Sequence, residues 1–130
     1  MAKIIITGAA GFIGYHLIKK IINKNYDFIL IDDYSRGKKD KPFNNIIKKR
    51  NIKFLNQDLT KPFEIKDQNI KYIFHLAARI GVKNVIEKPS ETINDNLLML
   101  INTINAVKKN NKKVKMIFFS TSEIYSPLIE

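Results

Sequence analysis

Short apolar runs alternate along the chain with longer stretches in which apolar residues recur every three or four positions. The apolar runs predict strands over 3–7, 27–32, 52–56, 71–76 and 114–119. The longer stretches predict helices over 12–24, 42–50 and 90–109, with a loop and short helix over 59–68 and loops over 33–41 and 77–89. Alternation of this kind is typical of a parallel sheet with helices on both faces.

The order of these elements predicts an α/β fold, a Rossmann-type doubly wound parallel sheet. Right-handed crossovers place its five strands in the order 3-2-1-4-5. The direction of winding then reverses between the first and fourth strands, so a ligand is expected over the carboxyl ends of these two strands. Because no linker or internal repeat interrupts the alternation, we expect residues 1–130 to form one domain.

A glycine-rich turn joins the first strand to the first helix. Its glycines, Gly8, Gly11 and Gly14, follow the pattern G-x-x-G-x-x-G. We expect the first to allow a sharp turn, the second to let a phosphate approach the backbone, and the third to let the helix pack closely on the sheet. Backbone N–H groups and the helix dipole favour an anion at such a turn, which predicts a site for a dinucleotide pyrophosphate.

A carboxylate, Asp32, ends the second strand 18 residues after Gly14. This spacing is close to the ~20 residues expected for a carboxylate that binds the ribose hydroxyl groups of a dinucleotide. Its negative charge would repel a 2′-phosphate, which favours NAD over NADP, whereas Arg36 could pair with that phosphate. The alternative is an ordinary strand, turn and helix followed by an acidic loop.

The formal net charge of +11 changes this interpretation little. Lysine pairs are spread over the whole chain, and a general bias towards Lys, Ile and Asn explains them better than a specific nucleic-acid surface. The absence of cysteine excludes disulfide and thiol chemistry. No segment resembles a signal peptide or a membrane span, so we expect a cytoplasmic protein with no membrane partner and no metal site.

Together with further motifs, these residues resemble the extended short-chain dehydrogenase/reductase family, the NAD-dependent epimerases and dehydratases of nucleotide sugars. Residues 7–14 look like the TGxxGFIG turn of that family, and residues 32–37 are similar to its ribose-binding loop. Residues 57–59 look like its adenine site, residues 75–78 match its HxAA segment, and residues 120–125 are similar to its S-[ST]-S-E-V-Y segment.

The resemblance implies a set of NAD contacts and three catalytic positions. The implied cofactor residues are Gly8, Gly11, Phe12, Ile13 and Gly14 in the turn, Asp32, Asp33, Ser35 and Gly37 in the ribose loop, Asp58 and Leu59 at the adenine, and Leu76, Ala77, Ala78 and Asn96 near the pyrophosphate and nicotinamide ribose. The implied catalytic residues are Thr121, Ser122 and Glu123. A nucleotide-sugar substrate, in particular a UDP-sugar, is implied as well, with His75 expected to be a structural residue at the end of a strand.

The chain departs from the family at the catalytic pair Tyr-x-x-x-Lys. Tyr15 with Lys19 and Tyr34 with Lys38 have this spacing, but they fall in the phosphate-binding helix and the ribose loop. We therefore expect an NAD-binding portion, truncated before the later strands and the sugar-binding domain and not catalytically competent alone. The alternatives are half of a split epimerase or decarboxylase completed by a second chain, and an NAD-binding module without catalysis. The resemblance also implies a homodimer or a second chain through helix 90–109.

Overall fold

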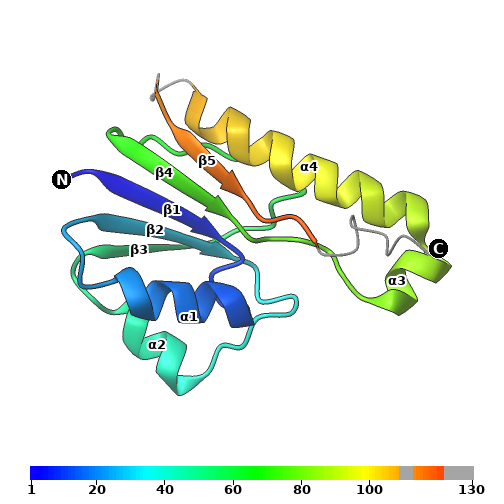
Figure 1. Ribbon diagram of the computed structural model, residues 1–130, viewed down its shortest axis with the longest axis horizontal. Helices are drawn as coiled ribbons and strands as arrows, with labels where there is room; N and C mark the ends of the chain where they lie inside the picture. The colour runs from blue at the N-terminus through cyan, green and yellow to red at the C-terminus, as the bar shows by residue number, and fades with distance from the viewer. Residues whose placement is uncertain (109–112, 122–130) are drawn as a thin grey trace, which may run out of the picture.

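A single parallel sheet organises the computed structural model, which describes residues 1–108 and 113–121 (Figure 1). In chain order the elements are β1 (Lys3–Thr7), α1 (Phe12–Ile21), β2 (Asp27–Asp32), α2 (Lys41–Ile47), β3 (Ile52–Asn56), β4 (Ile70–His75), α3 (Val82–Glu87), α4 (Pro89–Lys108) and β5 (Lys115–Phe118). The sheet order is β3-β2-β1-β4-β5, with every neighbouring pair parallel. The predicted Rossmann-type topology is therefore confirmed.

Two apolar clusters cover the two faces of the sheet. Because successive strand residues point to opposite faces, Ile4 and Ile6 of β1 pack with α1 and α2, whereas Ile5 packs on the other face with Ala106 and Val107 of α4. Figure 1 shows this arrangement, with α1 and α2 on one side of the sheet and α4 on the other. β1 and β2 are consequently buried on both faces, as their apolar sequences predict, whereas the face of β4 that carries Tyr72 and Phe74 is half-buried.

Two predicted elements differ from the structure. No helix forms over 59–68, because this segment uses its backbone groups against α4: the Ile65 N–H donates to the Ala106 carbonyl, and Asn102 Nδ2 donates to the Leu59 carbonyl. The predicted loop over 77–89 contains the short helix α3. The prediction of a helix at 59–68 is therefore wrong, since long-range bonds replace the local ones that a helix needs.

The carboxyl ends of the central strands meet at one edge of the sheet. Thr7, the last residue of β1, lies opposite Ile31 of β2 on one side and opposite His75 of β4 on the other. The chain winds away from β1 in opposite directions through β2 and β4, so this edge is the topological switch point.

A half-buried tyrosine anchors the loop that follows β2. Tyr34 has a positive φ of 60°, and its ring packs against Phe43 of α2 and Phe54 of β3 at centroid distances of 6.1 and 5.4 Å. Its hydroxyl oxygen is buried and has no hydrogen-bond partner among the described residues. A buried hydroxyl in that state costs stability, although the ring around it contributes apolar packing.

Tyr34→Phe is expected to raise the free energy of unfolding by about 1 kcal/mol, because it removes the unpaired hydroxyl and keeps the ring. Urea denaturation followed by circular dichroism measures this change. Tyr26→Phe is the matched control, since the Tyr26 ring is half-buried but its hydroxyl is not an unpaired buried group. A lower stability for Tyr34→Phe would show that its hydroxyl has a partner.

Candidate nucleotide-binding site

The glycine turn is held in a shape that only glycine permits at two of its positions. Gly8 has a φ of 66°, and a Cβ added to it would lie 2.8 Å from the Ala77 amide nitrogen. A Cβ on Gly14 would lie 2.3 Å from the Gly8 carbonyl oxygen, although Gly14 is helical and carries no positive φ. The turn therefore brings α1 against the end of β1 and leaves no room for larger residues.

The N-terminus of α1 is open towards solvent. Gly11 caps this ten-residue helix without a side-chain hydrogen bond, and its first turn contains no acidic residue. The side chains of the next two residues, Phe12 and Ile13, are 81% and 57% exposed. Unpaired N–H groups of a first turn carry partial positive charge, so this helix end suits a phosphate.

Asp32 ties the glycine turn to the loop after β2. One carboxylate oxygen accepts from the Ala10 N–H at 2.9 Å, and the other accepts from the Tyr34 N–H at 2.7 Å. Burial raises the pKa of the Asp32 carboxyl, and these two N–H donors act in the opposite direction. Since an ionised carboxylate accepts about four hydrogen bonds, each oxygen retains capacity for a ribose hydroxyl.

The rest of the loop after β2 lies against the turn. A Cβ on Gly37 would lie 2.6 Å from the Ala10 side chain, and the Lys38 N–H donates to the Ala10 carbonyl at 3.3 Å. Asp33 accepts from the Ser35 N–H at 2.9 Å, which closes a tight turn with both side chains exposed. These positions of the predicted ribose loop therefore sit beside Asp32.

At the end of β3, Asp58 is half-buried and its neighbour Leu59 is buried. One Asp58 carboxylate oxygen accepts from the Thr60 hydroxyl at 2.7 Å and from the Thr60 N–H at 2.9 Å. The Thr60 hydroxyl is the main cause that lowers the pKa of Asp58. The second oxygen lies 3.7 Å from the Lys61 ammonium on the surface. Asp58 can therefore accept from an adenine amino group, whereas the Leu59 side chain belongs to the core.

Thr7 locks the end of β1 to the segment after β4. Its hydroxyl oxygen accepts from the Leu76 N–H at 3.1 Å and the Ala77 N–H at 3.2 Å, and it lies 3.1 Å from His75 Nδ1. A hydroxyl has two lone pairs and one hydrogen, so its hydrogen is assigned to Nδ1 and the imidazole proton to Nε2. His75 is 2% exposed, and burial lowers its pKa to about 4. His75 is therefore a neutral structural residue. Thr7 is a positioning residue, and the sequence did not predict this role for it.

The segment after Ala78 is fixed from α4. Asn96 Oδ1 accepts from the Arg79 N–H at 2.7 Å, and Asn96 Nδ2 donates to the Arg79 carbonyl at 3.0 Å. Arg79 also pairs with Asp95 at 2.9 Å, while Ala78 is exposed. The Asn96 amide thus holds the loop that follows Ala78, and the cofactor contact implied by the resemblance stays a prediction.

Of the three predicted catalytic residues, Thr121 is exposed three residues after the end of β5, and Ser122 and Glu123 lie outside the described residues. The part of the chain that the structure describes holds no group of three or more His, Asp or Glu side chains that could bind a metal ion. It also contains no helix long and apolar enough to cross a membrane.

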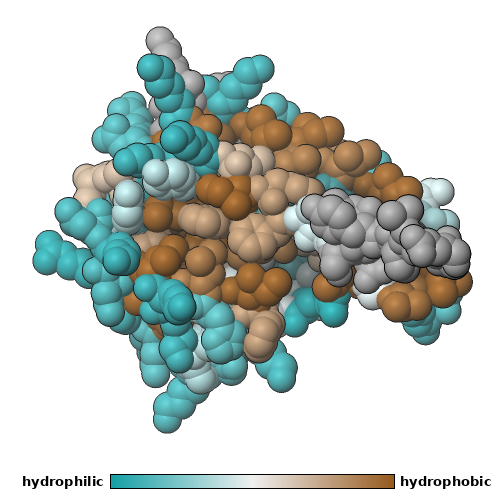
Figure 2. Space-filling view, viewed as in Figure 1, coloured by the Kyte–Doolittle hydropathy of each residue, from teal (hydrophilic) through white to brown (hydrophobic). Residues whose placement is uncertain are grey.

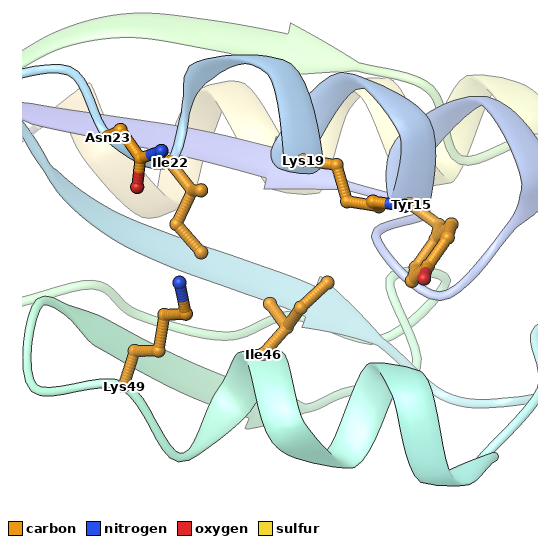
Figure 3. Close-up of a pocket in the computed structure, with 6 residues that line it drawn as sticks. All are labelled: Tyr15, Lys19, Ile22, Asn23, Ile46 and Lys49. Carbon is orange, nitrogen blue, oxygen red and sulfur yellow. The ribbon is translucent and has the colours of Figure 1, made fainter.

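An open hollow of about 280 Å³ lies between α1 and α2, away from the glycine turn (Figure 3). It is lined by Tyr15, Lys19, Ile22, Asn23, Ile46 and Lys49, none of which belongs to the predicted cofactor set. The Lys19 ammonium lies over the face of the Tyr15 ring, 5.5 Å from its centroid. Tyr15 and Lys19, which have the Tyr-x-x-x-Lys spacing, therefore form a cation–π contact on the surface.

His75 is expected to make the fold sensitive to acid. Its pKa is about 4 in the folded chain against 6.5 for an unperturbed histidine, so the unfolded chain binds the extra proton. The stabilisation is complete above pH ~6.5 and is lost as the pH falls towards ~4, a loss of about 3 kcal/mol at most. Urea denaturation at several pH values measures it.

The difference between wild type and His75→Asn isolates this effect from the titration of the carboxylates. The variant should lose less stability between pH 7 and pH 4 than the wild type. His16→Asn is the control, because His16 is the other histidine and is exposed. Parallel pH curves for wild type and His75→Asn would contradict the assignment of a buried neutral imidazole.

Known proteins with similar sequences and structures show which family this chain belongs to. The chain is 34% identical to the UDP-N-acetyl-alpha-D-glucosaminuronate decarboxylase of Bacillus cytotoxicus, with 95% of this chain and 37% of that protein covered. The solved UDP-Glc/GlcNAc 4-epimerase of Campylobacter jejuni superposes with a TM-score of 0.82 at 28% identity, over 97% of this chain and 39% of the other.

A UDP-glucose 4-epimerase of Bifidobacterium longum, solved in complex with NAD+ and UDP, superposes with a TM-score of 0.77 at 25% identity. The match covers 96% of this chain and 38% of that protein, so the chain spans well under half the length of these relatives. The sequence model of the NAD dependent epimerase/dehydratase family matches residues 4–130. The sheet order, the glycine turn and this match agree: the chain belongs to the NAD dependent epimerase/dehydratase family.

Proposed function

We propose that the chain is the NAD-binding portion of a nucleotide-sugar epimerase or dehydratase. One observation carries the proposal: Asp32 joins the glycine turn and the ribose loop at the switch point, beside an uncapped helix N-terminus. A carboxylate for ribose hydroxyls and free N–H groups for a pyrophosphate are the two polar contacts that a dinucleotide needs. Both stand at the same edge of the sheet.

The residues along the carboxyl edge of the sheet suit the successive parts of an NAD molecule. The N–H groups of Phe12 and Ile13 would hold the pyrophosphate, and Asp32 would hold the adenosine ribose, with Asp33, Ser35 and Gly37 lining the loop beside it. The Asp58 oxygen that accepts no hydrogen bond from Thr60 would accept from the adenine amino group. Small residues after β4, Ala77 and Ala78, leave the backbone accessible to the nicotinamide half. Bound NAD supplies a reversible hydride acceptor.

The charge of Asp32 favours NAD over NADP. Two backbone N–H donors support its ionised form, and a 2′-phosphate would bring a second negative charge to the same place. This argument from the site is consistent with the name of the family, which specifies NAD.

The activity of the whole protein is part of the proposal, because the chain spans 37% to 39% of the relatives compared above. We propose a UDP-sugar substrate and a role for Thr121, Ser122 and Glu123 at the sugar. In support, Thr121 follows β5, whose carboxyl end lies at the edge of the sheet that carries the proposed cofactor residues. A split enzyme and an NAD-binding module without catalysis are the alternatives. Epimerised or decarboxylated sugar formed by this chain alone would contradict all three, since each of them leaves the chain without catalytic activity of its own.

Titration calorimetry tests NAD binding. The wild-type chain should bind NAD, and Asp32→Ala should weaken binding at least tenfold, because hydrogen bonds to a charged group contribute roughly 1.5–3 kcal/mol. Asp27→Ala is the matched control, since it removes the same charge from the opposite end of β2. Equal affinities for the Asp32 and Asp27 variants, or no binding by the wild type, would contradict the proposal.

We also propose that α4 pairs with α4 of a second copy. Four apolar side chains, Ile93, Leu97, Ile101 and Ile104, are 43% to 62% exposed and recur every three or four residues along the helix. Figure 2 shows apolar surface gathered over α4. Antiparallel pairing would bring Glu91 in the first turn of one helix towards Lys108 in the last turn of the other. An exposed stripe with complementary ends fits self-association.

Sedimentation velocity over a range of concentrations tests this pairing. The wild-type chain should dimerise, and Leu97→Lys should shift it to monomer, because a charge at the centre of the stripe would be buried without a partner. Asn105→Lys adds the same charge at an exposed polar position outside the stripe and should leave the dimer intact. A wild type that stays monomeric, or associates only with a second kind of chain, would rule out the homodimer.

A further inference from the structure

An arginine joins the two loops that flank the glycine turn. Arg36 Nη1 donates to the Ile80 carbonyl oxygen at 3.0 Å. Arg36 lies in the loop after β2 and Ile80 in the loop after β4, and β1 is the strand between β2 and β4 in the sheet. The hydrogen bond therefore spans the carboxyl end of β1, where the glycine turn begins.

Both ends of this bridge are held by other contacts. Next to Arg36, Gly37 packs against Ala10 and the Lys38 N–H donates to the Ala10 carbonyl. On the other side, the Ile80 carbonyl also accepts from Asn84 Nδ2 at 3.2 Å, and Asn96 clamps the preceding residue. The guanidinium is consequently placed by two fixed loops, although its side chain is exposed.

The charge of Arg36 is not balanced by a carboxylate within ion-pair distance anywhere in residues 1–108 and 113–121. Asp32 and Asp33, in the same loop, bind backbone N–H groups instead. The bond to Ile80 uses one of the five N–H donors of a guanidinium, which leaves donors for a ligand. A planar cation with free donors beside an open helix N-terminus is suited to a phosphate.

We propose that Arg36 is a phosphate-binding residue of the nucleotide site and clamps the pyrophosphate of the dinucleotide from the side opposite the α1 N-terminus. The inference rests on the proposed NAD-binding function and adds a residue to that site. The geometry favours the pyrophosphate over a 2′-phosphate for two reasons. The guanidinium reaches towards Ile80, across β1 from the loop that carries Asp32, and the Asp32 carboxylate repels a phosphate on the adenosine ribose.

Calorimetric titration of adenosine, ADP, NAD and 2′-AMP into the full chain tests the role of Arg36. Arg36→Ala should weaken the binding of ADP and NAD about three- to tenfold and leave the binding of adenosine unchanged, because only the phosphate contact is lost. Arg36→Lys should restore part of the affinity, since it keeps the charge without the fork of donors. Arg50→Ala, which removes an exposed arginine between α2 and β3, is the matched control.

The outcomes separate this inference from the function on which it rests. Equal ADP and NAD affinities for Arg36→Ala and Arg50→Ala would overturn the role of Arg36 while the NAD site stands. A loss of affinity confined to 2′-AMP would overturn the pyrophosphate assignment and place the 2′-phosphate at Arg36. A wild-type chain that binds neither ADP nor NAD would overturn the proposed function, and the role of Arg36 with it. Thermal unfolding of each variant checks that the fold is intact.

Discussion

The carboxylate of Asp32 makes the contacts on which the proposed nucleotide site depends. It binds one backbone N–H from the glycine turn and one from the loop after β2, and so it fixes two segments that are far apart along the chain. Burying a carboxylate is unfavourable unless its oxygens are hydrogen-bonded, and these two N–H donors supply the bonds. The same residue that fixes these two segments is the one that we propose for the ribose hydroxyl groups.

Thr7 performs the corresponding task on the other side of β1. Its hydroxyl accepts from the two N–H groups that follow β4 and donates to Nδ1 of His75, whose imidazole is kept neutral by burial. With Asp32 on one flank and Thr7 on the other, the end of β1 is held between its two neighbours in the sheet. The small residues at Gly8 and Ala77 approach closely because both flanks are fixed.

Much of this arrangement is predictable from the order of residues. Apolar runs and helical spacing place the strands, and right-handed crossovers fix their order in the sheet, because these effects are local or follow from chain handedness. Gly8 and Gly14 are predictable from the turn itself, since sterics at the backbone require them. The helix expected within 59–68 does not form, because Leu59 and Ile65 bind α4 about forty residues away, which no local pattern reveals.

The sequence by itself determined the class of fold, the edge of the sheet at which the proposed cofactor site lies, and Asp32 as the carboxylate proposed for it. The tertiary structure alone decided which side chains complete that edge. Thr7 meets His75 across 68 positions, Arg36 meets Ile80 across 44, and Asn96 turns to the backbone of Arg79. The physical reason is that each of these contacts is made between strands or loops that become neighbours only when the parallel sheet has formed.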